Sequence, residues 1–367
     1  MTSKYDDRLS KLKTRRTPRQ TLAKSDSVTL DAAVIKESFE TKGKGNAARY
    51  ALGCIEEMKS DYTKISINDG NRISDQLKAG LSVGVETRLQ GSVPLNIHIR
   101  ASSDVDLLVI ATAFHTFASP AMPPASYVAN PSISPIERLN SLRTECESIL
   151  TTKYPAANID TSGSKAISVS GGSLARKVDV VPSHWHDNHN YQQMRQEYRR
   201  GIHILDRDAG KTHGNLPFLH MEYINEKDGR TNGNAKRAIR LLKCLSRDSD
   251  YDIKLTSYDL ACLIYHMDDT TLKTDAYHPL QLLPKIEAYL INRWNNAENT
   301  SALVTPDGTR KIVDSTSKHT SILFLAADLL DLIKEIGAEY NNLVSSYSDA
   351  SVALGAARTA LNEAVIF

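Results

Sequence analysis

The spacing of apolar side chains divides the chain into a mixed first half and a helical second half. Apolar residues recur at helical intervals in the segments 47–62, 71–81 and 135–151. Shorter apolar runs predict strands over 85–90, 105–110, 165–170, 174–181 and 201–206. Helical spacing dominates the rest, in the segments 235–246, 257–267, 280–294, 317–346 and 349–364, with a β-like interruption over 303–313. We therefore expect an α/β half that ends near residue 230 and a helical half after it.

Three aspartates fall on the predicted strands. Asp104 and Asp106 stand at the start of the run up to Ile110, and side chains two residues apart on a strand project from the same face. Asp179 lies on the second strand of a predicted hairpin whose turn is formed by residues 171–173. One sheet therefore carries all three acids. Carboxylate oxygens suit hard cations such as Mg²⁺, and a pair of such ions can support an in-line phosphoryl displacement.

Gly91 and Ser92 precede the first two acids and follow a predicted strand. Glycine permits the close backbone approach that a phosphate needs, and the following hydroxyl and N–H groups at a helix start can hold phosphate oxygens. The combination favours a catalytic site. The alternative is a structural turn followed by an ordinary edge strand, because an isolated Asp-x-Asp is common.

Composition adds limits on the class of protein. The chain has 367 residues, 41% of them hydrophobic and 24% charged, which is typical of a globular protein. The formal net charge of +2 does not by itself predict a nucleic-acid partner, and no apolar run is long enough to span a membrane. Its four cysteines have scattered spacings, so neither a zinc site nor a disulfide framework is expected. We expect a cytoplasmic protein.

Basic residues are concentrated near the front of the chain. Between Lys4 and Lys24 they include Arg15, Arg16 and Arg19, with few apolar residues among them. This composition predicts a solvated, flexible arm, and contact with a nucleic acid or a partner is the alternative.

Several of these motifs together resemble a known superfamily. Gly91-Ser92, the run 103–109 and the run 177–182 are similar to the polymerase-β-type nucleotidyltransferases. Within them they resemble the branch that contains cyclic GMP-AMP synthase, oligoadenylate synthase and the bacterial cGAS/DncV-like nucleotidyltransferases. The runs 236–243 and 253–258 are similar to segments that grip the donor nucleotide in this branch. The resemblance implies an α/β (α+β) fold: a basic arm over 1–45, a polymerase-β-like nucleotidyltransferase core with a mixed sheet over 46–230, and a C-terminal helical domain of the oligoadenylate synthase and cGAS type over 231–367.

The resemblance also implies roles for individual residues. Asp104 and Asp106 would hold two Mg²⁺ ions, with Mn²⁺ as a substitute, and Asp179 would mainly hold the ion that activates the acceptor hydroxyl. The residues expected to bind nucleotide are Gly91, Ser92, Lys243, Ser257 and Tyr258. Lys243 and Ser257 would contact donor phosphates and Tyr258 would stack on the base. A purely structural alternative makes Lys243 part of the wet side of an amphipathic helix and Tyr258 a core aromatic.

The implied function is the synthesis of a signalling nucleotide. Nucleoside triphosphates, ATP and GTP above all, would be joined into a cyclic di- or trinucleotide with loss of pyrophosphate, in antiphage signalling of the CBASS type. The enzyme would be a monomer that needs no nucleic-acid activator, and a regulatory protein partner is implied by the resemblance alone. The alternatives are an RNA-end nucleotidyltransferase and a scaffold that senses nucleotides or RNA.

Two local features of the sequence are not explained by the resemblance to this branch. Where members of this branch often have a threonine after Gly-Ser, this chain has the run 93–100, in which Asn96 could replace it as a ligand or cap. His184, His186 and His189 lack the spacing of a metal site, so we expect a polar loop beside the acceptor site, with a structural metal as the alternative. His203 is expected to pack rather than to act in catalysis.

Overall fold

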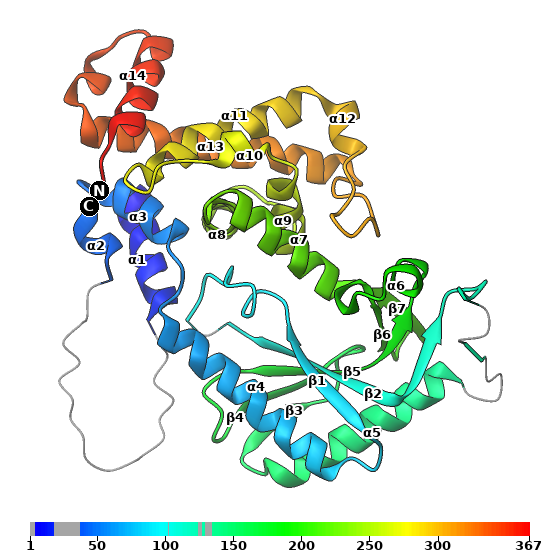
Figure 1. Cartoon of the computed structure of the whole chain (residues 1–367). Helices are drawn as coiled ribbons and strands as arrows, with labels where there is room; N and C mark the ends of the chain where they lie inside the picture. Colours follow the sequence, from blue (N-terminus) through cyan, green and yellow to red (C-terminus); the bar gives the residue numbers. More distant parts are fainter. Residues whose placement is uncertain (1–3, 18–36, 102, 124–126, 129–133) are drawn as a thin grey trace, which may run out of the picture. The chain divides into compact units, whose positions relative to one another are not determined.

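The computed structural model describes residues 4–17, 37–101, 103–123, 127–128 and 134–367 (Figure 1). Residues 58–222 form one compact unit, called the α/β unit below. The described residues before 58 and after 222 form a second, called the helical unit. The mixed α/β core and the C-terminal helical domain that the sequence predicted are therefore confirmed. The predicted boundaries of the three segments stay a prediction.

A mixed sheet of seven strands organises the described part of the α/β unit. The strands are β1 (Val85–Gln90), β2 (Val105–Phe117), β3 (Ala157–Asp160), β4 (Ile167–Gly171), β5 (Val178–Asp187), β6 (Gly201–Asp206) and β7 (Lys211–Asn215). Their order is β1-β2-β5-β4-β3, and β6 pairs with β5 and β7. β2 and β5 are parallel, whereas β1 and β4 pair with them in the antiparallel direction. The predicted antiparallel pairing of β4 and β5 is confirmed, but β5 begins at Val178, so the connection is longer than the predicted turn at residues 171–173.

Two helices cover one face of this sheet, α4 (Ser60–Gly80) and α5 (Pro135–Lys153) (Figure 1). Leu107 and Val180 belong to the core that packs with Ile73 of α4 and Leu142 of α5. Because side chains alternate along a strand, the residues next to Leu107 and Val180 project from the opposite face. Asp106 is one of them. The acidic side chains thus lie on the face that α4 and α5 leave uncovered.

Two predictions for the α/β half were wrong in detail. The helix expected over 47–62 is interrupted, because α3 (Asn46–Ile55) ends before α4 begins at Ser60. The polar loop expected around His184 and His186 is instead part of β5. Both histidines pair with β6, His184 opposite His203. A continuous ladder of backbone hydrogen bonds therefore extends the strand through a polar sequence.

The helical unit is built from short and medium helices. Those of the second half are α8 (Asn234–Asp248), α9 (Ser257–Tyr265), α10 (Asp269–Leu272), α11 (Leu282–Asn295), α12 (Ala297–Ser301), α13 (Thr316–Tyr340) and α14 (Ala350–Glu363). The described residues also form α2 (Phe39–Lys42), α6 (His189–Met194), α7 (Pro217–Arg230) and the 3₁₀ segments η2 (Glu197–Arg199), η3 (Pro279–Gln281) and η4 (Asn342–Ser346). The predicted β-like interruption is a single bridge between Val304 and Lys311.

The N-terminal segment is a packed helix, α1 (Lys4–Arg16), so the prediction of a flexible arm was wrong there. Leu9 and Leu12 are buried, and the Arg8 guanidinium donates to Asp328 of α13 at 2.8 Å. Lys13, Arg15 and Arg16, which suggested a solvated arm, instead form ion pairs with acids outside α1. The rest of the predicted arm, with Arg19 and Lys24, lies outside the described residues.

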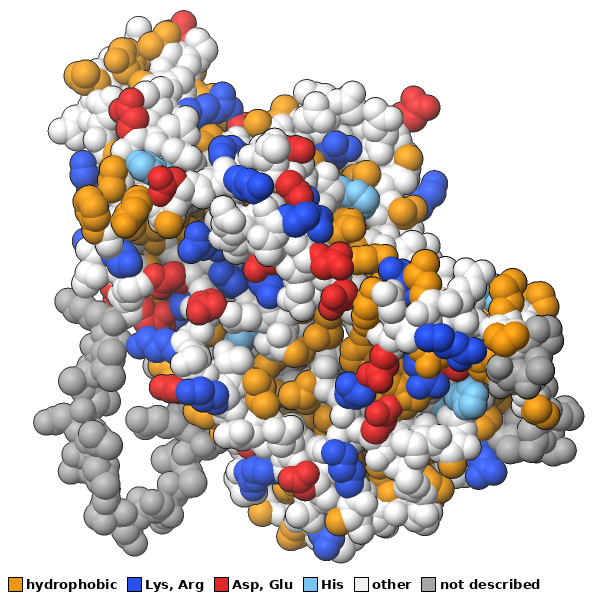
Figure 2. Space-filling model, in the orientation of Figure 1, with side chains coloured by type: hydrophobic (Ala, Val, Ile, Leu, Met, Phe, Trp, Pro, Cys, Tyr) orange, Lys and Arg blue, Asp and Glu red, His pale blue; other side chains and the backbone are white. Residues whose placement is uncertain are grey.

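Basic and acidic side chains are interspersed on the face drawn in Figure 2, as the small net charge suggests. Among the helices that the structure describes, none combines the length and the apolar character needed to cross a membrane.

Candidate functional site

Three carboxylates meet on the uncovered face of the sheet. Asp106 of β2 and Asp179 of β5 are partners in the parallel register, and Asp104 directly precedes β2. Nζ of Lys177 lies 3.4 Å from Oδ2 of Asp104 and 3.1 Å from Oδ2 of Asp179. The structure thus brings together the three acids that the sequence predicted.

The electrostatics of this cluster favour a cation. Burial, together with the neighbouring carboxylates of Asp179 and Asp104, raises the pKa of Asp106 to about 6. Lys177 opposes this repulsion. Within the described ranges no three His, Cys, Asp or Glu side chains are already arranged around one metal position. The donor set of three carboxylates nevertheless fits hard divalent ions such as Mg²⁺, which would relieve the same repulsion.

Gly91 sits directly against this cluster. It has a φ of +82°, and a Cβ atom at this position would collide with Oδ2 of Asp106. Only glycine combines this backbone conformation with such a close approach. The helix start expected after Ser92 is absent, because residues 91–96 form turns closed by hydrogen bonds such as Ile97 N to Ser92 O at 3.0 Å. Asn96 has a φ of +55°, so it stabilises the turn, and its role as a ligand stays a prediction.

Two neighbours of the acids were not predicted from the sequence. Lys177 bridges Asp104 and Asp179, as described above, and the hydroxyl of Ser168 donates to Oδ1 of Asp179. Ser168 reaches Asp179 because the two residues are register partners in the β4–β5 hairpin. The predicted hairpin did not contain this signal, because a turn at residues 171–173 would place Ser168 opposite Arg176, and the longer connection that the structure has shifts the register to Asp179.

Lys243 lies on α8 of the helical unit and is 7% exposed. Burial lowers the pKa of Lys243 to about 8. Arg240, one turn earlier, donates from Nε to the carbonyl oxygen of Ile55 at 2.9 Å. Neither Lys243 nor Arg240 is on a solvent-exposed side of α8. The structural alternative that places Lys243 on such a side is therefore wrong. A buried cation is suited to a phosphate group.

Tyr258 is held by residues of a loop far along the chain. Its hydroxyl donates to Oδ2 of Asp307 at 2.9 Å, and the Arg310 guanidinium lies 5.1 Å from the ring centroid. Arg310 in turn donates to Oδ1 of Asp259 at 2.6 Å. Ser257 is exposed at the first position of α9. Asp307 and Arg310 were not among the residues predicted from the sequence, which indicated only a β-like interruption over 303–313.

The predicted site residues therefore fall into two groups. The acids and Gly91 with Ser92 belong to the α/β unit, and Lys243, Ser257 and Tyr258 belong to the helical unit. The contact of either group with a nucleotide stays a prediction.

Known proteins give an independent comparison. Residues 222–333 match the family model of the cGAS/DncV-like nucleotidyltransferase C-terminal helical domain. The chain is 36% identical over 315 residues to the cyclic dinucleotide synthase CdnE of Yersinia aleksiciae, which covers 83% of this chain and 81% of that protein. It is 32% identical over 243 residues to a c-di-GMP synthase of a Lachnospiraceae bacterium (strain RUG226), covering 60% of this chain and 69% of that protein.

Solved structures share the fold. The STING-associated CdnE c-di-GMP synthase from Capnocytophaga granulosa superposes with a TM-score of 0.71 at 26% identity, and the match covers 92% of this chain and 99% of that one. The corresponding Flavobacteriaceae protein gives a TM-score of 0.76 at 22% identity with the same coverage. The match to the Yersinia protein is too long to fit within either unit alone. The chain therefore belongs to the cGAS/DncV-like nucleotidyltransferases.

Proposed function

We propose that this protein joins two nucleoside triphosphates into a cyclic dinucleotide, with release of pyrophosphate, in antiphage signalling of the CBASS type. The observation that carries the proposal is the cluster of three carboxylates on adjacent strands, in a chain 36% identical to a cyclic dinucleotide synthase. The name of that relative narrows the expected product from a di- or trinucleotide to a dinucleotide. A cytoplasmic location and a regulatory partner stay predictions.

The three aspartates would hold two Mg²⁺ ions. Such ions, when bound, supply Lewis-acid chemistry that favours the deprotonated hydroxyl and the leaving pyrophosphate. Asp179 can take up the proton of the acceptor hydroxyl, and Ser168 fixes the orientation of its carboxylate. The turn after Gly91 offers backbone N–H groups at the place where donor phosphates would meet Asp106.

The helical unit would bind the rest of the donor nucleotide. Lys243 provides a positive charge for phosphate oxygens, Ser257 a hydroxyl, and Tyr258 a flat surface for the base. The acceptor hydroxyl oxygen forms a bond to the α-phosphorus of the donor, and the bond from that phosphorus to pyrophosphate breaks. A second reaction of the same kind in the linear intermediate closes the ring.

GTP is the substrate that the relatives favour. The Lachnospiraceae relative and the Capnocytophaga neighbour are both named c-di-GMP synthases. We therefore expect GTP to be used, with ATP as the second expected substrate.

The experiment is incubation of the purified chain with each labelled nucleotide, alone and in pairs, with Mg²⁺ or Mn²⁺. Phosphatase treatment and mass spectrometry follow. We expect a phosphatase-resistant cyclic dinucleotide whose formation falls about 10²- to 10³-fold in Asp106→Asn, since the variant removes one carboxylate from the metal-binding set. Thermal unfolding of the variant should match that of the unaltered chain. Extension of an added RNA end, or equal product from Asp106→Asn, would contradict the proposal.

A further inference from the structure

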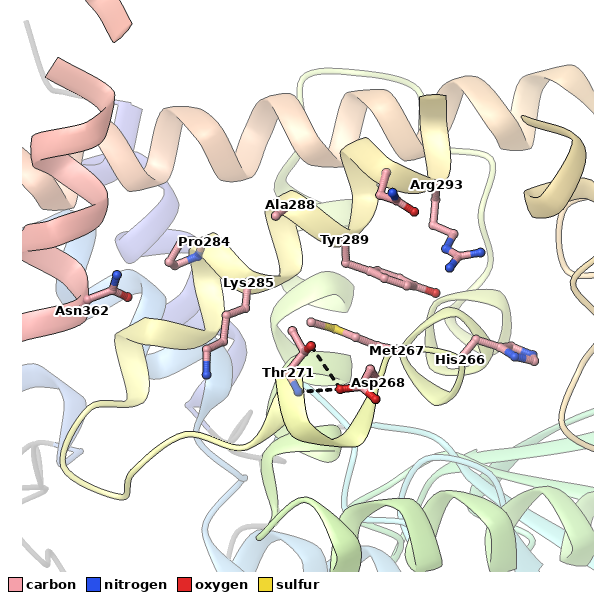
Figure 3. A pocket seen from close by; sticks show the side chains of 11 residues that line it. His266, Met267, Asp268, Thr271, Pro284, Lys285, Ala288, Tyr289, Arg293 and Asn362 are labelled. Atoms are coloured by element: carbon pink, nitrogen blue, oxygen red, sulfur yellow. Dashed lines mark hydrogen bonds between the residues drawn. The ribbon is translucent and has the colours of Figure 1, made fainter. Parts of the chain in front are cut away.

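A hollow of about 690 Å³ lies within the helical unit, between α11, the segment that leads into α10, and α14 (Figure 3). Its volume is within the range of roughly 300–1,000 Å³ that is typical of small-molecule sites. None of the residues that line it belongs to either group of predicted site residues. The hollow is therefore separate from the residues proposed for synthesis.

One face of α11 carries two cationic side chains and one aromatic side chain that line the hollow. Lys285, Tyr289 and Arg293 are four residues apart, so they project from the same side of the helix toward the hollow (Figure 3). Leu283 and Leu290, on a different face of the helix, are buried in the core. Eight residues of helix place the backbones of Lys285 and Arg293 about 12 Å apart. The two cations thus stand toward opposite ends of the hollow, with an aromatic ring between them.

Arg293 has unused hydrogen-bonding capacity. Its guanidinium lies 5.1 Å from the centroid of the Tyr289 ring, and its buried Nε has no hydrogen-bond partner. A buried donor without a partner is costly, so the guanidinium is held in place by packing on Tyr289 and not by an acidic neighbour among the described residues. Its outer Nη atoms, which are not among the buried ones, can contact an acidic group of a ligand.

Lys285 has no acidic partner among the residues that the structure describes. Its Nζ donates to the carbonyl oxygen of Lys273 at 2.8 Å, and burial lowers the pKa of Lys285 without any opposing effect from an acidic neighbour. Asp268 lines the hollow, but its carboxylate accepts from the backbone N–H of Thr271 at 2.9 Å and from the Thr271 hydroxyl at 3.2 Å (Figure 3). That carboxylate is already used to cap α10.

We propose that this hollow binds a small organic anion with a flat ring and an acidic group toward each end. Arg293 and Lys285 contact the acidic groups, while Tyr289 and Met267 line the space for the ring. Phosphate and carboxylate groups share the required chemistry. The inference does not rest on the proposed synthase activity.

The test uses 8-hydroxypyrene-1,3,6-trisulfonate, a flat fluorescent polyanion, and its fluorescence anisotropy with the full chain in the absence of divalent metal. We expect saturable binding that weakens about tenfold in Arg293→Gln and in Lys285→Gln, the loss typical of one charged contact. Arg293→Lys should retain part of the affinity. Lys334→Gln, which removes an exposed cation of α13, should bind like the unaltered chain. Thermal unfolding of each variant shows that the fold is kept.

Two results would overturn the proposal. One is the absence of saturable binding, and the other is equal affinity in Arg293→Gln, Lys334→Gln and the unaltered chain, which would mean non-specific attraction to surface charge. Displacement of the probe by adenosine 3′,5′-bisphosphate would assign the site to organic phosphates. Displacement by naphthalene-2,6-dicarboxylate would assign it to organic carboxylates. Displacement by neither would also contradict the proposal.

Discussion

At Gly91 the backbone conformation and the carboxylate of Asp106 together leave no room for a side chain. We expect Gly91→Ala to lower synthase activity about 100-fold. The added Cβ atom would collide with the Asp106 carboxylate and move it away from its position in the site. The free energy of unfolding should fall by about 1–2 kcal/mol, the cost of a left-handed conformation. Rates of product formation and urea denaturation provide the measurement.

Gly171→Ala is the matched control for this variant. Gly171 has a φ of +77° in the same unit, and nothing lies within 4 Å of its added Cβ. It should lose similar stability but keep its activity. Equal activities of the two variants would show that the contact with Asp106 does not matter for catalysis.

Tyr258 allows the ring and the hydroxyl to be tested separately. Tyr258→Leu removes the ring, and the KM for the donor nucleotide should rise about tenfold or more, since stacking of a base on an aromatic ring contributes about 1–3 kcal/mol. Tyr258→Phe removes only the hydrogen bond to Asp307 and should leave the KM nearly unchanged. Steady-state kinetics of both variants provide the measurement. An equal rise in both would mean that Asp307 positions the ring and that the ring alone is insufficient.

Residues whose function depends on their own strand were predictable, and residues that depend on distant partners were not. The spacing of Asp104 and Asp106 fixes their common face whatever the rest of the chain does. Arg310 contacts a ring 52 positions earlier in the chain, and no local pattern connects the two. The same holds for Lys177, whose contact with Asp104 exists only because β2 and β5 are adjacent.

At the scale of elements, the β5–β6 pair buries histidines that resist protonation. Burial lowers the pKa of His184 to about 4 and that of His203 to about 4, from an ordinary value of 6.5. Between pH 6.5 and about 4 the unfolded chain takes up protons that the folded pair does not. The free energy of unfolding therefore decreases as the pH falls through this window. Above pH 6.5 these histidines add no pH dependence to the free energy of unfolding.

The contribution of His184 can be isolated by substitution. His184→Gln should reduce the pH dependence of the unfolding free energy in that window by on the order of 1 kcal/mol for each pH unit. Urea denaturation at several pH values measures it. His278→Gln, which changes a histidine of the helical unit, should keep the slope of the unaltered chain. The same slope in both variants would contradict the assignment to His184.

α1 shows why the prediction from composition failed for an element. Its charges suggested solvent, but Tyr5, Leu9 and Leu12 recur at helical spacing and are buried. Arg15 donates to Oδ2 of Asp248 at 2.7 Å, so the positive charge is balanced within the helical unit. Net charge along a segment cannot show this, because Asp248 and Asp328, which pair with Arg15 and Arg8, lie more than two hundred residues away.

For the whole molecule, the residues predicted to act in synthesis are divided between the two compact units of the chain. The acids belong to the α/β unit, and Lys243 with Tyr258 belongs to the helical unit. The helical unit also contains the N-terminal helix α1, so the chain starts in the unit in which it ends. The pattern of the sequence could predict two halves with a boundary near residue 230. It could not predict that α1 belongs to the helical unit, because that depends on contacts between the two ends of the chain.

Mixing two inactive variants tests whether each chain builds its own site. Asp106→Asn disables the α/β unit and Lys243→Ala the helical unit, so in a monomer every molecule of the mixture is defective. We expect no cyclic product above that of the separate variants, measured by pyrophosphate release and mass spectrometry. A mixture of the unaltered chain with Asp106→Asn should retain activity in proportion to the unaltered chain, which excludes inhibition by the variant. Recovery of activity in the first mixture would mean that two copies share a site, since only a site built from both chains can combine an intact α/β unit with an intact helical unit.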